Sequence, residues 1–357
     1  MAAGDRDLVF GLFDWVDRSD ADLASIYEER LRMAEYADRA GYWCYHVAEH
    51  HGTPLGMAPS PSVFLGAVAQ RTTRLRFGPL VYILPLYNPM RLAEEVCMLD
   101  QLSRGRLELG IGRGSSPWEL EMLGVDVAQT RDMYAEGLKI FLAALTAGQV
   151  TAEGRYYTLR EARLELRPYQ RPYPPLWYPT SNPDTIPWVA EHGYQVLLSF
   201  NTPTPAEVRR RLDLYRAHLP RAASNPDRVN PQVAHPRYGA VRKVYVAETD
   251  AEAHRVAREA LARFRHSFTF LWELHGIQSF TDNLANYEDC LERCVLFAGS
   301  PATVRERLGA FLAATGANYF GGCFAWGNLS GDQVLRSLDL FTKEVAPAFP
   351  GALAPAG

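Results

Sequence analysis

Short apolar runs alternate with amphipathic segments of helical period along the whole chain, and this alternation restricts the possible folds more than any other feature. Eight runs have the length and apolar character of buried strands, at 8–13, 43–48, 75–84, 106–111, 175–179, 195–200, 240–247 and 317–324. Because a helical segment follows each run, we expect parallel strands in an α/β protein. Eight such units favour a closed (β/α)₈ TIM barrel, and an open, doubly wound sheet is the alternative.

Two segments interrupt the repeating units. Gly154 lies between two short runs of β character, so the sequence predicts a surface hairpin near 150–166, inserted before the fifth strand. The stretch 266–299 is aromatic and irregular, and we interpret it as a mobile lid, with a packed surface excursion as the alternative. Composition shows no break along the chain, and we expect residues 1–357 to form a single barrel domain with insertions.

Composition and charge argue against several classes of partner. With 37 basic and 41 acidic residues the net charge is −4, which disfavours nucleic acid as the main partner. The chain has no stretch of 18 apolar residues and no leader pattern at its N-terminus, so we expect a cytoplasmic protein without a membrane partner. The 5 cysteines form no C-x-x-C pair and no H-E-x-x-H motif occurs, so we predict reduced thiols and no metal.

In a barrel the chemistry lies at the carboxyl ends of the strands, which directs attention to the histidines after the second run. His46 and His50 fall on one face of an extended strand about 13 Å apart, at ~3.3 Å per residue, so they cannot chelate one metal ion. Histidine titrates near neutral pH and suits general-base catalysis. His50 is therefore a candidate catalytic residue, and a hydrogen-bonded structural role is the alternative.

Two further strand ends carry residues suited to binding a phosphate. The fourth run ends in LGIGRGSSP, where small residues let the backbone approach a ligand and Arg113 can hold a phosphate. A tight glycine turn with a surface arginine is the alternative. The fifth run ends in YPTSNPDTIPW, where Ser181, Asn182 and Thr185 precede a helix. These residues can bind an anion or cap the helix, and the two roles are compatible.

Taken together, these segments resemble the bacterial luciferase family of flavin monooxygenases. The resemblance is carried by EHHGTP, GPLVYILPLYNP, RLAEEVCMLDQLSRGRLELGIGRG, SNPDT, PWVAEHG, LLSF, GSPATV and GANYFGGCF, which cover most of the chain. The block that joins LDQLSRGR to GIGRG is the most specific of these segments. The resemblance implies a closed barrel that binds reduced FMN at the carboxyl ends of its strands.

The resemblance also implies roles for individual residues. His50 matches the catalytic histidine of the family, and Arg113 matches the arginine that holds the FMN phosphate. The bond between Leu80 and Val81 matches a non-prolyl cis peptide under the flavin ring, and Phe200 matches an aromatic residue near that ring. The implied cofactor-binding residues are Leu80, Val81, Arg113, Ser115, Ser181, Asn182, Thr185 and Phe200.

The chain departs from the luciferase α subunit at three places. Gly112 replaces its reactive cysteine, Ser181 replaces a glutamate, and its tyrosine-and-acid loop becomes the segment 116–119. These departures argue against light emission and a long-chain aldehyde substrate, and they leave the flavin site intact.

The activity that the resemblance implies is that of a two-component monooxygenase. Reduced FMN would arrive from a separate flavin reductase, and dioxygen would add to it to form a peroxyflavin that oxygenates a small, apolar organic substrate. Trp118, Phe324 and Trp326 are candidate residues of the substrate pocket, and each could instead belong to the core. The resemblance also implies a homodimer packed through the second and third helices. The alternatives are a deazaflavin-dependent oxidoreductase that transfers hydride on the same barrel, and a non-catalytic flavin-binding protein.

Overall fold

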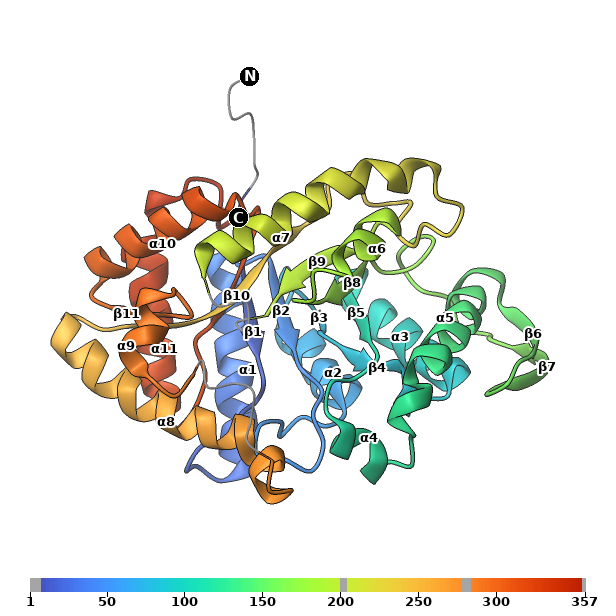
Figure 1. Ribbon diagram of the computed structural model, residues 1–357, viewed down its shortest axis with the longest axis horizontal. Helices are drawn as coiled ribbons and strands as arrows, with labels where there is room; N and C mark the ends of the chain where they lie inside the picture. Colours follow the sequence, from blue (N-terminus) through green and yellow to red (C-terminus); the bar gives the residue numbers. More distant parts are fainter. Residues whose placement is uncertain (1–7, 200–203, 278–283, 355–357) are drawn as a thin grey trace.

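The computed structural model describes residues 8–199, 204–277 and 284–354, and a parallel barrel forms its centre (Figure 1). Around the barrel the strands follow in the order β3, β2, β1, β12, β10, β9, β8, β5. Their bounds are β1 Val9–Asp14, β2 Cys44–Val47, β3 Arg76–Pro79, β5 Leu109–Gly112, β8 Leu176–Pro179, β9 Gln195–Leu198, β10 Tyr238–Val246 and β12 Tyr319–Cys323.

A short bridge between β3 and the residues before β5 closes the ring. Phe77 pairs in parallel with Leu107. The Phe77 amide donates to the Arg106 carbonyl at 3.1 Å, and the Glu108 amide donates to the Phe77 carbonyl at 2.8 Å. Eight parallel strands therefore form a closed ring, which confirms the predicted TIM barrel.

The third expected strand is divided in two. β3 ends at Pro79, the chain turns at Leu80 and Val81, and β4 spans only Tyr82–Ile83. β4 then pairs with the end of β5, where Tyr82 lies beside Ile111. The division places a turn, instead of a continuous strand, at the rim of the barrel.

The stretch 266–299, predicted to be irregular, contains two helical segments and a strand, so the prediction is wrong for these parts. These elements are the end of α8 (Asp250–Leu274), α9 (Tyr287–Glu292) and an additional strand, β11 (Leu296–Gly299), that pairs with β10 outside the ring. The helix continues past residue 265, and its buried positions still recur at helical spacing as far as Ser267. Residues 278–283 lie outside the described part, and a mobile lid stays a prediction.

Helices cover the outside of the barrel, and a two-stranded hairpin projects beside α5 (Figure 1). The hairpin consists of antiparallel β6 (Gln149–Glu153) and β7 (Thr158–Arg163). The other helices are α1 Leu23–Ala40, α2 Pro61–Arg71, α3 Pro89–Ser103, α4 Pro117–Met122, α5 Thr130–Ala147, α6 Ile186–Glu191, α7 Pro205–His218, α10 Pro301–Thr315 and α11 Gly331–Leu340.

Candidate active site

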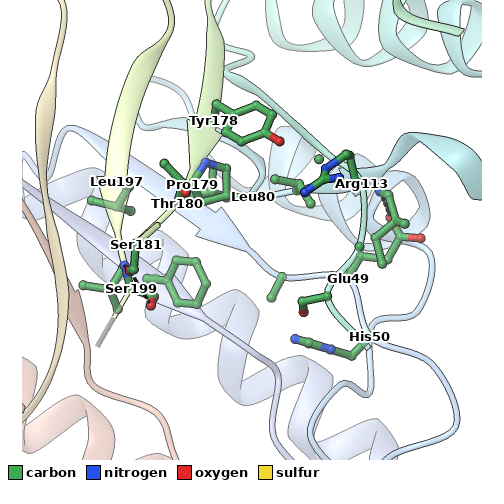
Figure 2. Close-up of a pocket in the computed structure, with 18 of the residues that line it drawn as sticks. Glu49, His50, Leu80, Arg113, Tyr178, Pro179, Thr180, Ser181, Leu197 and Ser199 are labelled. Carbon is green, nitrogen blue, oxygen red and sulfur yellow. Dashed lines mark hydrogen bonds between the residues drawn. The ribbon is translucent and has the colours of Figure 1, made fainter. Parts of the chain in front are cut away.

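A cavity of about 540 Å³ lies at the carboxyl ends of the barrel strands, where a barrel is expected to carry its chemistry (Figure 2). Its wall comes from the ends of β1, β2, β5 and β8, from the turn between β3 and β4, from β9 and β10, and from α8. Segments that are far apart in the sequence therefore share one cavity.

The cavity brings together the predicted catalytic histidine and all the predicted cofactor-binding residues that the structure describes. These residues are His50, Leu80, Val81, Arg113, Ser115, Ser181, Asn182 and Thr185. Phe200 lies outside the described residues. The common location of the other eight residues is compatible with the roles that the resemblance implies, and those roles stay predictions.

The turn between β3 and β4 forms one wall of the cavity. Leu80 and Val81 line it and are joined by a non-prolyl cis peptide bond, as the resemblance implies. β5 lies so close to this turn that a Cβ on Gly110 would be 2.4 Å from the Pro79 carbonyl oxygen. A Cβ on Gly112 would be 2.9 Å from Cγ2 of Val81. The glycines of the GIGRG segment therefore allow the fifth strand to pack on this turn, next to Arg113.

His50 is held by a buried carboxylate. Its Nδ1 lies 3.0 Å from Oε1 of Glu119, whose side chain is only 5% exposed. Oε2 of Glu119 accepts the backbone N–H of His51, also at 3.0 Å. Because a carboxylate only accepts hydrogen bonds, Nδ1 of His50 carries the hydrogen. This contact leaves Nε2 as the nitrogen available to the cavity, toward which the His50 ring points in Figure 2.

A second buried carboxylate connects the histidine segment to the turn between β3 and β4. Oε1 of Glu49 lies 2.9 Å from Nε2 of His51. Oε2 of Glu49 accepts the Ile83 amide and the Tyr87 hydroxyl, each at 3.0 Å. Burial, followed by the nearby charge of Glu49, raises the pKa of Tyr87, so the hydroxyl stays a donor. Glu49 therefore joins the side chain of His51 to the backbone and the tyrosine that follow the turn.

His46 lies in the barrel core and takes no part in this site. Its ring packs against Trp177 and Tyr319, with centroid distances of 5.1 and 5.9 Å. Burial lowers the pKa of His46 to about 3, because a charged imidazole would lose its hydration there. The conclusion that His46 and His50 do not share a metal ion agrees with these separate locations.

Arg113 presents a cation to the cavity. Its side chain is exposed, and no acidic side chain pairs with it in the described ranges 8–199, 204–277 and 284–354. Ser115 lies two residues further on, and Thr185 faces the same cavity without making a side-chain hydrogen bond to cap α6. A guanidinium group and two hydroxyl groups can therefore bind a phosphate at this wall.

Ser181 joins the ends of β8 and β9. Its Oγ lies 2.9 Å from Oγ of Ser199 and accepts the Ser199 amide at 3.1 Å. Its carbonyl accepts Nε of Arg211 at 2.8 Å. Oδ1 of Asn182 accepts the Asp184 amide at 3.0 Å. Ser181 and Asn182 therefore shape this corner of the cavity through contacts within the protein.

Trp118 does not line the cavity. It stacks on His275 at a centroid distance of 4.7 Å and meets the edge of Trp272 at 4.6 Å. Trp118 lies on α4, and both of its aromatic neighbours lie at the end of α8. The structure thus does not place Trp118 in the pocket wall as expected; instead, Trp118 joins α4 to the end of α8.

Phe324 and Trp326 are also absent from the cavity wall, and each is only 1% exposed. Phe324 packs edge-to-face on Phe341 at 5.2 Å, and Nε1 of Trp326 donates to the Val244 carbonyl at 3.3 Å. Their assignment to the pocket is therefore wrong, and the core alternative is correct. The chain turns after β12 so that these rings fill the space between the barrel and its helices.

Sequence reasoning overlooked several residues of the site. Glu119 belongs to the segment 116–119 that departs from the luciferase α subunit. Ser116 signals the start of a helix with Glu119 in its first turn, but this signal does not predict a contact with His50. Glu49 immediately precedes His50 and could have been found from that adjacency. The barrel rule, applied to the end of the first strand, would have identified Phe13 and Trp15.

Residues 8–319 match the family model described as luciferase-like monooxygenase. The chain belongs to this family. An uncharacterized protein of Sinorhizobium fredii, y4wF, is 38% identical over 95% of this chain and 96% of its own length. The 4-hydroxyprotoasukamycin monooxygenase of Streptomyces nodosus is 29% identical over 90% of this chain and 87% of its own length.

Solved structures share the fold. The oxygenating constituent of 3,6-diketocamphane monooxygenase from Pseudomonas putida, in complex with FMN, has a TM-score of 0.78 and 24% identity, covering 95% of this chain and 98% of its own. An F420-dependent secondary alcohol dehydrogenase in complex with an F420-acetone adduct has a TM-score of 0.71 and 19% identity, covering 96% and 98%. The same fold therefore occurs in an oxygenating constituent in complex with FMN and in an F420-dependent dehydrogenase.

The described part of the chain lacks two kinds of feature. None of its helices is both long and apolar enough to cross a membrane. Within the same residues, no group of three or more histidine, cysteine or acidic side chains is arranged to hold a metal ion. The cytoplasmic location stays a prediction.

Proposed function

We propose that this protein is the oxygenase component of a two-component flavin monooxygenase, which uses reduced FMN from a separate reductase and dioxygen to oxygenate a small, apolar organic substrate. The observation that carries the proposal is the His50–Glu119 pair at the edge of a cavity that also presents Arg113. The volume of about 540 Å³ suits a cofactor site, since such pockets measure ~300–1,000 Å³.

The residues present fit FMN. Arg113 has no ionic partner among the described residues, and together with the Ser115 and Thr185 hydroxyls it would hold the phosphate. Leu80 and Val81 offer an apolar surface for the ring system. When bound, reduced FMN would supply the electrons that activate dioxygen, which amino-acid side chains do not supply.

The protein itself would contribute a positioned base and a sheltered cavity. Glu119 accepts the hydrogen bond from Nδ1 of His50, so Nε2 is free to accept a proton from a group bound in the cavity. Glu119 is buried, so this orientation is not lost to competing water. The two carboxylates Glu49 and Glu119 together keep the histidine segment in place.

The test is binding of reduced FMN without oxygen, followed by stopped-flow mixing with aerated buffer. We expect the protein to bind reduced FMN and to delay its reoxidation, and His50→Ala to shorten that delay without weakening binding. His266→Ala, at a half-exposed position of α8, is the control variant. Binding of a deazaflavin in preference to FMN would contradict the proposal and favour the hydride-transfer alternative. FMN binding together with a reoxidation delay that His50→Ala leaves unchanged would favour a non-catalytic flavin-binding protein.

We also propose a homodimer that packs through α2 and α3. Val63 on α2 is 77% exposed, and Met98 and Leu102 on α3 are 52% and 51% exposed. α2 and α3 contact each other, so these side chains can contribute to one apolar surface that a second copy would cover. Light scattering should show a mass of two chains, and Met98→Glu combined with Leu102→Glu should give one. A single-chain mass for the unmodified protein would contradict this proposal.

A further inference from the structure

The order of the strands divides the cavity wall into a polar and an apolar part. β5 and β8 are neighbours in the ring, and the segments after them supply Arg113, Asn182 and Thr185. β9, β10 and β1 supply another part of the wall, and α8, which contacts β10, adds Phe268 to it. The part of the wall that we call the apolar wall consists of Phe13, Trp15, Leu197, Val241 and Phe268.

Contacts between aromatic rings support this wall. The rings of Phe13 and Trp15 meet edge-to-face with centroids 4.5 Å apart. Behind the wall, the buried ring of Phe264 lies 5.2 Å from Trp15 and stacks on Phe268 at 5.9 Å. Phe264 thus connects the aromatic residues at the end of β1 to Phe268 on α8.

No charged side chain from β1, β9, β10 or α8 lines the cavity in the described part of the chain. Ser199 contributes a polar side chain there, and its hydroxyl lies 2.9 Å from that of Ser181. A charged ligand would therefore lose its hydration at the apolar wall and gain no ionic partner, whereas a neutral apolar ligand would gain buried area.

Two features connect this wall to the proposed catalytic group. β2, which leads to His50, is the neighbour of β1 in the ring, so the apolar wall begins beside the histidine. The end of α8, which carries Phe268, is held by the contact of Trp272 and His275 with Trp118 on α4. α4 therefore carries both Glu119, which orients His50, and the tryptophan that holds this end of α8.

We infer that the apolar wall is the substrate subsite, that it takes a neutral, cyclic apolar compound, and that Phe268 sets the size of the ring system it accepts. The inference rests on the proposed function, since it assigns the polar part of the cavity wall, which contains Arg113 and Thr185, to the cofactor. Flat aromatic side chains offer the largest contact area to a ring, which makes a cyclic compound the best fit. Phe268 is the member of the wall that comes from outside the barrel, so its side chain can change without altering the strands.

The experiment is calorimetric binding of two probes that share one ring system, 2-acetylnaphthalene and 2-naphthoate, to the full chain. The neutral ketone should bind, and the carboxylate should bind about tenfold more weakly or not at all. Phe268→Ala should weaken ketone binding about tenfold through lost apolar contact. Phe270→Ala, on the same helix but outside the cavity wall, is the matched control and should leave binding unchanged. Phe268→Trp, which keeps an aromatic ring, should exclude the ketone by narrowing the subsite.

Equal affinity for the two probes would overturn the assignment of a neutral ligand. Unchanged ketone binding in both Phe268 variants would overturn the role of that residue. Melting temperatures of all variants check that the fold is retained, and FMN binding is measured with the same samples. Normal FMN binding without ketone binding contradicts this inference alone, whereas failure of the unmodified protein to bind FMN contradicts the proposed function.

Discussion

Replacing Glu119 by glutamine tests whether the buried carboxylate orients His50. The carboxylate accepts two hydrogen bonds, from Nδ1 of His50 and from the His51 amide, each at 3.0 Å. Glutamine has nearly the same shape but offers one acceptor and one donor, so one of these two N–H groups would face an N–H group. A hydrogen bond to a charged group contributes about 1.5–3 kcal/mol, and the side chain of Glu119 is 5% exposed, so solvent does not replace it.

If this energy is used to hold His50 in its working orientation, Glu119→Gln should reduce the His50-dependent part of the stopped-flow signal about 10- to 100-fold. FMN affinity should stay the same, because the hydrogen bonds of the Glu119 carboxylate go to His50 and His51 and to none of the proposed phosphate-binding residues. Nitrogen NMR of the histidines should show that the hydrogen no longer resides mainly on Nδ1 of His50. Glu121→Gln, at an exposed position of the same helix, is the control. Equal kinetics in the two variants, with an unchanged His50 tautomer, would refute the reasoning.

Three further changes test other parts of the structure. Arg113→Ala should weaken FMN binding about 10-fold or more and leave the binding of riboflavin, which has no phosphate, unchanged. The melting temperature should also stay the same, because the guanidinium group has no ionic partner among the described residues. An equal loss of affinity for both ligands would argue against a phosphate contact. Gly110→Ala should cost about 1–3 kcal/mol in the free energy of unfolding, since its Cβ would lie 2.4 Å from the Pro79 carbonyl oxygen. The control is Gly66→Ala on α2, whose Cβ would meet no atom within 4 Å and which should be neutral or stabilising. Urea titration of both variants measures the difference, and equal midpoints would contradict the prediction. Burial lowers the pKa of His46 from 6.5 to about 3, so the unfolded state binds more protons than the folded state between these pH values. His46 should therefore reduce the free energy of unfolding by about 2 kcal/mol from pH 7 to pH 5, and this loss should be absent in His46→Phe. An identical pH dependence of the urea midpoint in both proteins would contradict this assignment.

The barrel could be predicted from the sequence because strand and helix patterns are local. Apolar runs of strand length and apolar residues at helical spacing reflect which side chains face the core, and each pattern is complete within a few residues. The failure at 266–299 came from the same source, since the aromatic residues at the end of α8 obscured the helix, which continues to Leu274 after its buried positions stop. The roles of Phe324 and Trp326 could not be predicted, because a ring that follows a strand can turn toward the cavity or the core.

The amino-acid sequence is sufficient to predict the eight strands of the ring, the family, and the residue types at the strand ends, including His50 and Arg113. The three-dimensional arrangement was needed to see which of these side chains share a cavity, that Glu119 contacts His50 across 69 residues of chain, and that Phe268 lines the cavity. The physical reason is that periodicity records whether a position is buried, whereas contacts between distant segments depend on the closure of the ring and on how the helices pack against it.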